Sequence, residues 1–70
     1  MAGRGLDESA RNYIASLVEA GRSGDYVKDA IANRVRSTDW DRQKNQRFLG
    51  WLRDKGYDRT AETLARFMDG

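Results

Sequence analysis

Residues 48–68, FLGWLRDKGYDRTAETLARFM, are the stretch on which the fold depends. Apolar side chains from Phe48 to Leu52 are followed by Gly56, which lacks a Cβ and so permits the left-handed turn that ends a helix. The stretch contains both phenylalanines and one of the two tryptophans of the chain. We therefore predict a helical hairpin whose apolar side needs a surface to pack against.

A third helix is predicted after a break at residues 37–39, and the hairpin begins inside this helix. Thr38 and Asp41 have the spacing of a capping box at its start. The next seven residues, 41–47, include no apolar side chain, so we expect these two turns to face solvent or a polar partner. Asp58 caps a fourth helix, whose apolar stripe comprises Ala61, Leu64, Ala65 and Met68.

Two further helices are predicted upstream. The first starts at the acidic turn of residues 7–9 and ends at Gly21, and the second follows a cap at either Ser23 or Asp25 and runs to about Arg36. Residues 1–5 are expected to be a flexible tail. No segment alternates with period two, so neither a strand nor an internal repeat is predicted. The buried stripes are Ala10, Tyr13, Ile14, Leu17 and Val18 in the first helix, and Val27, Ala30, Ile31 and Val35 in the second.

The composition limits both the size of the core and the chemistry. Seventy residues form one domain, residues 1–70, with a marginal core. The chain has no cysteine and no histidine, so disulfides, thiolate metal sites and the usual general base are missing. We predict an all-α bundle of four short helices, stabilised by dimerisation or by binding a partner.

The same composition argues against an enzyme, a cofactor, a metal site or a small-molecule substrate. The serines have no nearby base, and capping explains the acidic residues at the helix starts. No apolar run reaches the roughly 18 residues of a membrane span, and the N-terminus does not resemble a signal peptide. We expect a soluble, cytoplasmic protein without membrane contact.

Two surfaces are candidates for binding. The net charge is only +2, but a local basic cluster is either a nucleic-acid contact or a solvated helix face. The aromatic residues of the hairpin belong either to the core or to a protein interface. The candidate nucleic-acid contacts are Arg34, Arg36, Trp40, Arg42, Lys44 and Arg47. The candidate interface residues are Phe48, Trp51, Leu52, Tyr57, Leu64 and Phe67.

Residues 6–31, LDESARNYIASLVEAGRSGDYVKDAI, resemble the helical part of ParD-type antitoxins of the ribbon-helix-helix superfamily. The likeness lies in Leu6-Asp7-Glu8, in Gly21-Arg22 and in residues 25–31. It implies a dimer that binds operator DNA through a two-stranded ribbon and neutralises a toxin with its C-terminal region. The DNA-reading strand of that family would precede Leu6, so no DNA-contacting residue is carried over.

Residues 48–68 also resemble a LisH motif, a short helical hairpin that dimerises. The matching elements are Phe48-Leu49 and Leu52 before Lys55-Gly56-Tyr57, and then Thr60-Ala61 and Leu64. The resemblances lead to two expected functions. One is a small antitoxin-like regulator of bacterial or phage type that binds a partner protein and DNA. The alternative is a pure interaction or dimerisation module, such as a phage-encoded inhibitor that docks on a larger host complex.

Overall fold

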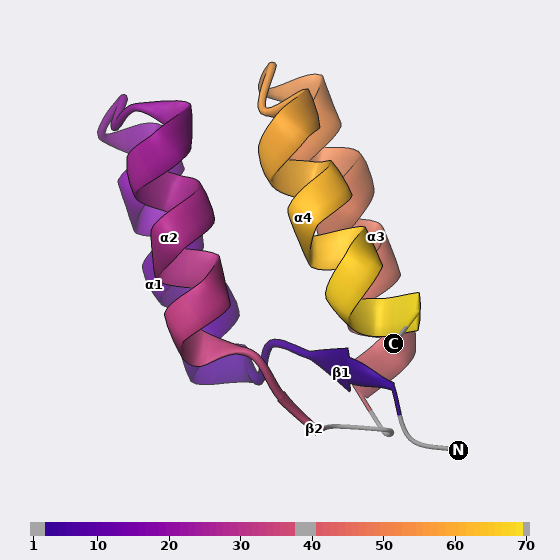
Figure 1. Ribbon diagram of the computed structural model, residues 1–70. Helices are drawn as coiled ribbons and strands as arrows, with labels where there is room; N and C mark the ends of the chain where they lie inside the picture. Colours follow the sequence, from indigo (N-terminus) through magenta and orange to yellow (C-terminus); the bar gives the residue numbers. More distant parts are fainter. Residues whose placement is uncertain (1–2, 38–40, 70) are drawn as a thin grey trace.

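The chain folds as two helical hairpins that stand side by side on a short two-stranded ribbon (Figure 1). The computed structural model describes residues 3–37 and 41–69. Strand β1 (Arg4–Gly5) leads into helices α1 (Glu8–Glu19) and α2 (Gly24–Arg34). Strand β2 (Arg36–Ser37) then leads into α3 (Arg42–Asp54) and α4 (Asp58–Asp69). The prediction of an all-α bundle of four short helices is confirmed.

Each hairpin turns at a glycine in the left-handed region, with a φ of +76° at Gly21 and +88° at Gly56. The residue after each glycine donates its N–H to a carbonyl one turn back, from Arg22 to Leu17 at 3.1 Å and from Tyr57 to Leu52 at 2.9 Å. These bonds satisfy carbonyls that the ends of α1 and α3 would leave unpaired. The predicted stops at both glycines are therefore confirmed.

The helix starts follow the predictions in part, since Ser23 caps α2 but the predicted cap Asp58 lies inside α4 as its first residue. Asp7 accepts a hydrogen bond from the Ala10 N–H at 2.8 Å, and Ser23 accepts one from the Tyr26 N–H at 3.2 Å. Of the two alternatives for α2, the cap is thus Ser23. Helix α4 begins at Asp58. The capping box rests on Thr38, which lies outside the described residues.

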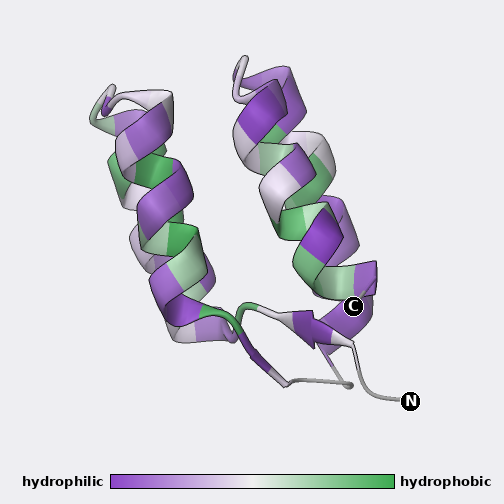
Figure 2. Ribbon diagram, viewed as in Figure 1, coloured by the Kyte–Doolittle hydropathy of each residue, from purple (hydrophilic) through white to green (hydrophobic). Residues whose placement is uncertain are grey.

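The core joins both hairpins, so the C-terminal hairpin α3–α4 finds its packing surface within the chain. Helix α4 packs against both α2 and α3, and α1 packs against α2. Figure 2 shows hydrophobic and hydrophilic residues alternating around the helices, as amphipathic helices require. The buried apolar residues are Leu6, Ala10, Ile14, Leu17, Val18, Val27, Ala30, Ile31, Phe48, Leu49, Leu52, Ala61, Leu64 and Met68.

The ribbon, which is the antiparallel pair β1 and β2, was not expected. Arg4 lies opposite Ser37, and Gly5 lies opposite Arg36. The predicted flexible tail is therefore wrong for residues 4 and 5, because strand pairing holds them. A Cβ on Gly5 would lie 3.0 Å from the Asn45 side chain, so a glycine permits this close approach. Strands of two residues are too short to show alternation in the sequence.

The order strand–helix–helix occurs twice, although no internal repeat was predicted. Counted back from the glycine of each turn, Leu17 corresponds to Leu52 and Ile14 to Leu49, and all four are buried. The two halves therefore have the same local plan, with little identity between their sequences.

Candidate functional site

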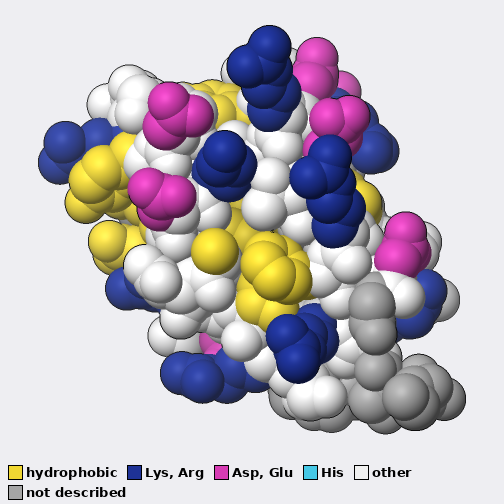
Figure 3. Space-filling view, in the orientation of Figure 1, with side chains coloured by type: hydrophobic (Ala, Val, Ile, Leu, Met, Phe, Trp, Pro, Cys, Tyr) yellow, Lys and Arg dark blue, Asp and Glu magenta, His cyan; other side chains and the backbone are white. Residues whose placement is uncertain are grey.

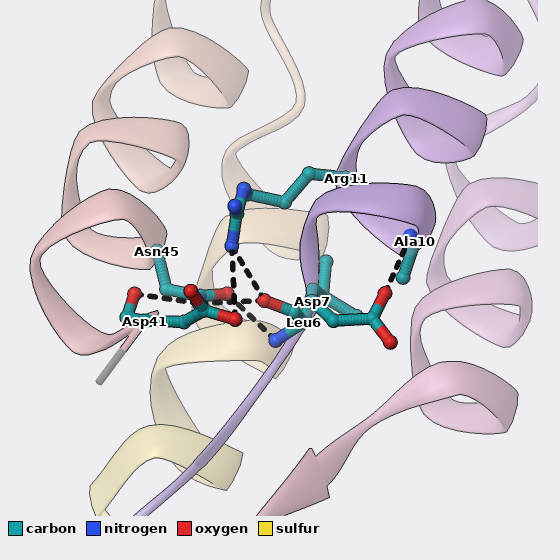
Figure 4. Close-up of polar contacts among 6 residues, drawn as sticks. All are labelled: Leu6, Asp7, Ala10, Arg11, Asp41 and Asn45. Atoms are coloured by element: carbon teal, nitrogen blue, oxygen red, sulfur yellow. Dashed lines mark hydrogen bonds and ion pairs between the residues drawn. The ribbon is translucent and has the colours of Figure 1, made fainter. Parts of the chain in front are cut away.

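A buried polar cluster joins the two hairpins just above the ribbon, as Figure 4 shows. It comprises Arg11, Asp41, Asn45 and the backbone of Leu6. Asn45 accepts a hydrogen bond from the Leu6 N–H at 2.7 Å and donates to the Leu6 carbonyl at 2.8 Å. It also donates to the Asp41 carbonyl at 2.9 Å. One side chain thus fixes the start of α1 to the first turn of α3.

The ionic part of this cluster is loosely paired. Arg11 donates to the Leu6 carbonyl at 2.6 Å and lies 3.8 Å from an Asp41 carboxylate oxygen. Asp41 is fully buried, and within residues 3–37 and 41–69 neither of its carboxylate oxygens accepts a hydrogen bond. Its charge is therefore compensated mainly by Arg11, because a buried charge without a partner is costly.

The cluster corrects the expectation that residues 41–47 face solvent or a polar partner. Asp41 and Asn45 are both fully buried. Helical spacing accounts for this, since Asn45 lies four residues before Leu49 and seven before Leu52, on one side of α3. That spacing is visible in the sequence and is the signal that would have identified Asn45 as an inward-facing residue. Arg11 has a similar signal, since it lies three residues before Ile14 and seven before Val18, which are both buried.

A groove runs between α1 and α3 along the outside of the bundle. Its volume is about 440 Å³. On α3 the groove residues are spaced by three and four positions, so they form one helix face. The lining residues are Arg11, Asn12, Ala15 and Glu19 from α1, and Lys44, Arg47, Phe48 and Trp51 from α3.

Two stacked aromatic rings form the apolar part of this groove. The ring centroids of Phe48 and Trp51 lie 5.4 Å apart, with 15° between the ring planes. Lys55 places its ammonium 5.8 Å from the Trp51 ring. Phe48 is buried and Trp51 is half-buried, so the indole offers apolar surface at the groove.

The structure separates the predicted interface residues. Leu52 and Leu64 are fully buried in the core of the chain itself. Tyr57 and Phe67 are half-buried, and the Tyr57 hydroxyl donates to the Arg22 carbonyl at 2.7 Å near the turns. Of the six predicted residues, Phe48 and Trp51 are the two that line the groove.

The predicted basic cluster is likewise divided among several places. Arg34 covers the Tyr13 ring at 4.0 Å, and Arg36 lies on β2. Arg42, Lys44 and Arg47 are exposed on α3. Trp40 lies outside the described residues.

The ribbon end carries exposed basic residues from both strands. Directly opposed residues of an antiparallel pair share a face of the ribbon. A Cβ on Gly5 would point to Asn45, so Arg4 and Ser37 lie on the face turned away from the helices. The Arg42 guanidinium lies beside Gly3, with Nη1 3.2 Å from the place a Cβ would take there. Arg4, Arg36 and Arg42 are all exposed.

The face formed by α2 and α4 is mixed in charge. In Figure 3, basic and acidic side chains are interspersed over this face. Among the described residues, no group of three potential metal-ligating side chains occurs. None of the described helices combines the length and apolar character needed to cross a bilayer.

Comparison of the chain with protein-family models, with curated protein sequences and with solved structures found no match.

Proposed function

We propose that this chain is a small non-enzymatic regulatory protein that acts by binding a partner protein in the groove between α1 and α3. The observation that carries the proposal is the Phe48–Trp51 stack at an open helix–helix seam. Aromatic residues are enriched among the residues that dominate protein interfaces, and a tryptophan retaining exposed ring surface can bury it on binding.

The rest of the bundle supports the same assignment. Leu52 and Leu64 are fully buried in the core of the chain, so they cannot contact a partner. The groove has solvent-accessible walls on two helices, and both walls belong to regular elements that hold their side chains in fixed positions. Antitoxin-like inhibition and docking on a larger complex both require such a surface.

Site-specific photo-crosslinking in the native host tests the proposal. A benzoylphenylalanine at Ala15, on the groove wall, should capture one protein, and the same group at Glu62, exposed on α4, should not. Trp51→Ala should reduce the yield from position 15 at least tenfold while circular dichroism stays unchanged. Equal capture from both positions, or capture that Trp51→Ala leaves intact, would refute binding in the groove.

A second candidate function is DNA binding through the ribbon. The ParD-type resemblance requires a strand directly before Leu6, and β1 occupies that place. In that family the ribbon forms between two chains, whereas here β1 pairs with β2 of the same chain. Arg4 and Arg36 lie on opposite faces of the ribbon, so one face presents at most two of the exposed cations Arg4, Arg36 and Arg42 for phosphate contacts.

Salt dependence tests the DNA candidate directly. Two phosphate contacts predict that affinity for a duplex falls roughly 12-fold between 50 and 200 mM salt. Fluorescence anisotropy with a 20-base-pair duplex measures this, and the triple variant Arg4→Gln, Arg36→Gln and Arg42→Gln should abolish the salt dependence. An absence of binding at 50 mM salt would eliminate this candidate and leave the groove proposal standing.

A further inference from the structure

The groove between α1 and α3 differs in charge from the mixed face of α2 and α4. Lys44 and Arg47 stand on its α3 wall, and Glu19 is the one carboxylate that lines it. Arg11 also lines the groove, but its guanidinium is directed to Asp41 and to the Leu6 carbonyl. The charges that remain for an incoming ligand are therefore mainly positive.

These two cations have no carboxylate partner in the described part of the chain, where Arg11–Asp41 is the one ion pair. Lys44 and Arg47 are three residues apart, so they project from the same side of α3. The stacked rings of Phe48 and Trp51 continue this side toward the turn. One half of the groove is thus basic and the other half is aromatic.

We infer that the occupant of the groove is a single amphipathic helix of another protein, with apolar residues on one face and carboxylates along its edge. This inference rests on the proposed function and names the chemistry of its partner. A helix is the element that lays an apolar stripe into a groove between two other helices. Its apolar stripe meets Trp51 and Phe48, while carboxylates reach Lys44 and Arg47.

The charge of the groove also disfavours a second copy of this chain as the occupant. Two copies that dock groove to groove bring the lysine and arginine pairs of both chains into one interface. Like charges placed together in an interface oppose association. The same charges attract a partner with acidic residues, which raises the association rate and makes binding more specific.

Designed peptides test the inference without knowledge of the natural partner. Three 14-residue helices share one leucine stripe and carry Glu, Lys or Gln at the flanking positions. They are lactam-stapled at outward-facing positions so that helix formation is equal, and their length of roughly 21 Å matches α3. Titration of the Glu peptide into ¹⁵N-labelled protein should shift the NMR resonances of the Trp51 indole N–H and of the backbone amides of α1 and α3. The Lys peptide should bind at least tenfold more weakly.

Charge reversal supplies the matched variants. Lys44→Glu with Arg47→Glu should lower the affinity for the Glu peptide at least tenfold and raise the affinity for the Lys peptide. Lys28→Glu with Arg53→Glu changes the net charge equally at exposed positions outside the groove, and should change either affinity less than twofold.

The outcomes separate this inference from the proposed function. If all three peptides bound in the groove with equal affinity, the inference of an acidic partner would be overturned, and the groove would remain a protein-binding site. No shift in the groove with any peptide would overturn both. A dimer in sedimentation that dissociates in the Trp51→Ala variant would identify a second copy as the occupant and overturn the inference.

Discussion

The two helical hairpins share one topology and differ in what they bury. In α1 the buried positions nearest the ribbon are Leu6, just before the helix, and Ala10. Their counterparts at α3, counted back from the glycine of each turn, are Asp41 and Asn45, which are equally buried. The N-terminal hairpin therefore places apolar groups where the C-terminal hairpin places a carboxylate and an amide.

This difference shows that the same helical plan serves two purposes. The polar residues of α3 bind the backbone and Arg11 of the first half, so they join the halves at one defined register. Hydrogen-bonded polar groups in a core restrict the partners that each element accepts, as apolar packing alone does not. The aromatic residues of α3, in turn, extend outward to the groove.

The largest effect is expected from truncating corresponding leucines. Leu52→Ala should lower the free energy of unfolding by about 3–5 kcal/mol, since Leu52 is fully buried in the core. Leu17→Ala should cost less, about 2–3 kcal/mol, because that side chain is 8% exposed. Urea unfolding measures both. A chain of this length has roughly 4–10 kcal/mol in total, so Leu52→Ala should remove about half of its stability. A larger loss for Leu17→Ala would show that core packing in the first hairpin contributes more to stability than core packing in the second.

The second-largest loss of stability is expected when the buried cation of Arg11 is removed. Arg11→Met keeps the apolar stem but leaves Asp41 without its cation, which should cost about 3 kcal/mol. The double variant Arg11→Met with Asp41→Asn should be more stable than Arg11→Met, because no lone buried charge remains. Equal stabilities of the two variants in urea would show that Arg11 acts through its bond to Leu6 alone.

Asn45→Ala makes α3 resemble α1 at the corresponding position. It leaves the Leu6 N–H and carbonyl without their amide partner, and should cost about 2–3 kcal/mol. Hydrogen exchange at the Leu6 amide should accelerate in parallel. Gln46→Ala, at the exposed neighbouring position, is the control and should stay within about 0.5 kcal/mol of the native protein. A similar loss for both variants would contradict a specific role for the amide.

The smallest effect is expected at the turns, where the two hairpins are alike. Gly21→Ala and Gly56→Ala each place a Cβ in the left-handed region, and each should cost about 1–2 kcal/mol. Neither position has a neighbour within 4 Å of the added Cβ, so the cost is conformational and should be equal in thermal unfolding. Unequal costs would show that the two turns are not equivalent.

Much of this fold is predictable from local rules. Helical spacing identifies most of each buried stripe, although Tyr13 of the first helix is wrong because it is 38% exposed beneath Arg34. The absence of a Cβ identifies the stops at Gly21 and Gly56. These features depend on neighbours within one or two turns of the chain. The amphipathic pattern also shows that the C-terminal hairpin requires a packing surface, although it does not show that α2 and β1 supply it.

The polar cluster and the groove are harder to predict because they depend on contacts between distant residues. Asn45 looks like part of a solvated run until its position relative to Leu49 is counted, and its partner Leu6 is 39 residues away. Spacing alone places Lys44, Arg47 and Trp51 on one face of α3, but whether that face borders a groove depends on the path of α1, which the residues of α3 do not encode. Charge in the sequence indicates cations, and the fold decides which of them share a surface.

The bond between Leu6 and Asn45 also determines when the protein can finish folding on the ribosome. Leu6 leaves the exit tunnel early, but its N–H and carbonyl wait for a side chain from the first turns of α3. Until then, among the residues that the structure describes, Arg11 is the one side chain of the first half that bonds the Leu6 carbonyl, and the Leu6 N–H has only water as a partner. The N-terminal hairpin is thus synthesised well before it can be locked in place. Its final structure therefore forms only after the first turns of α3 have been synthesised.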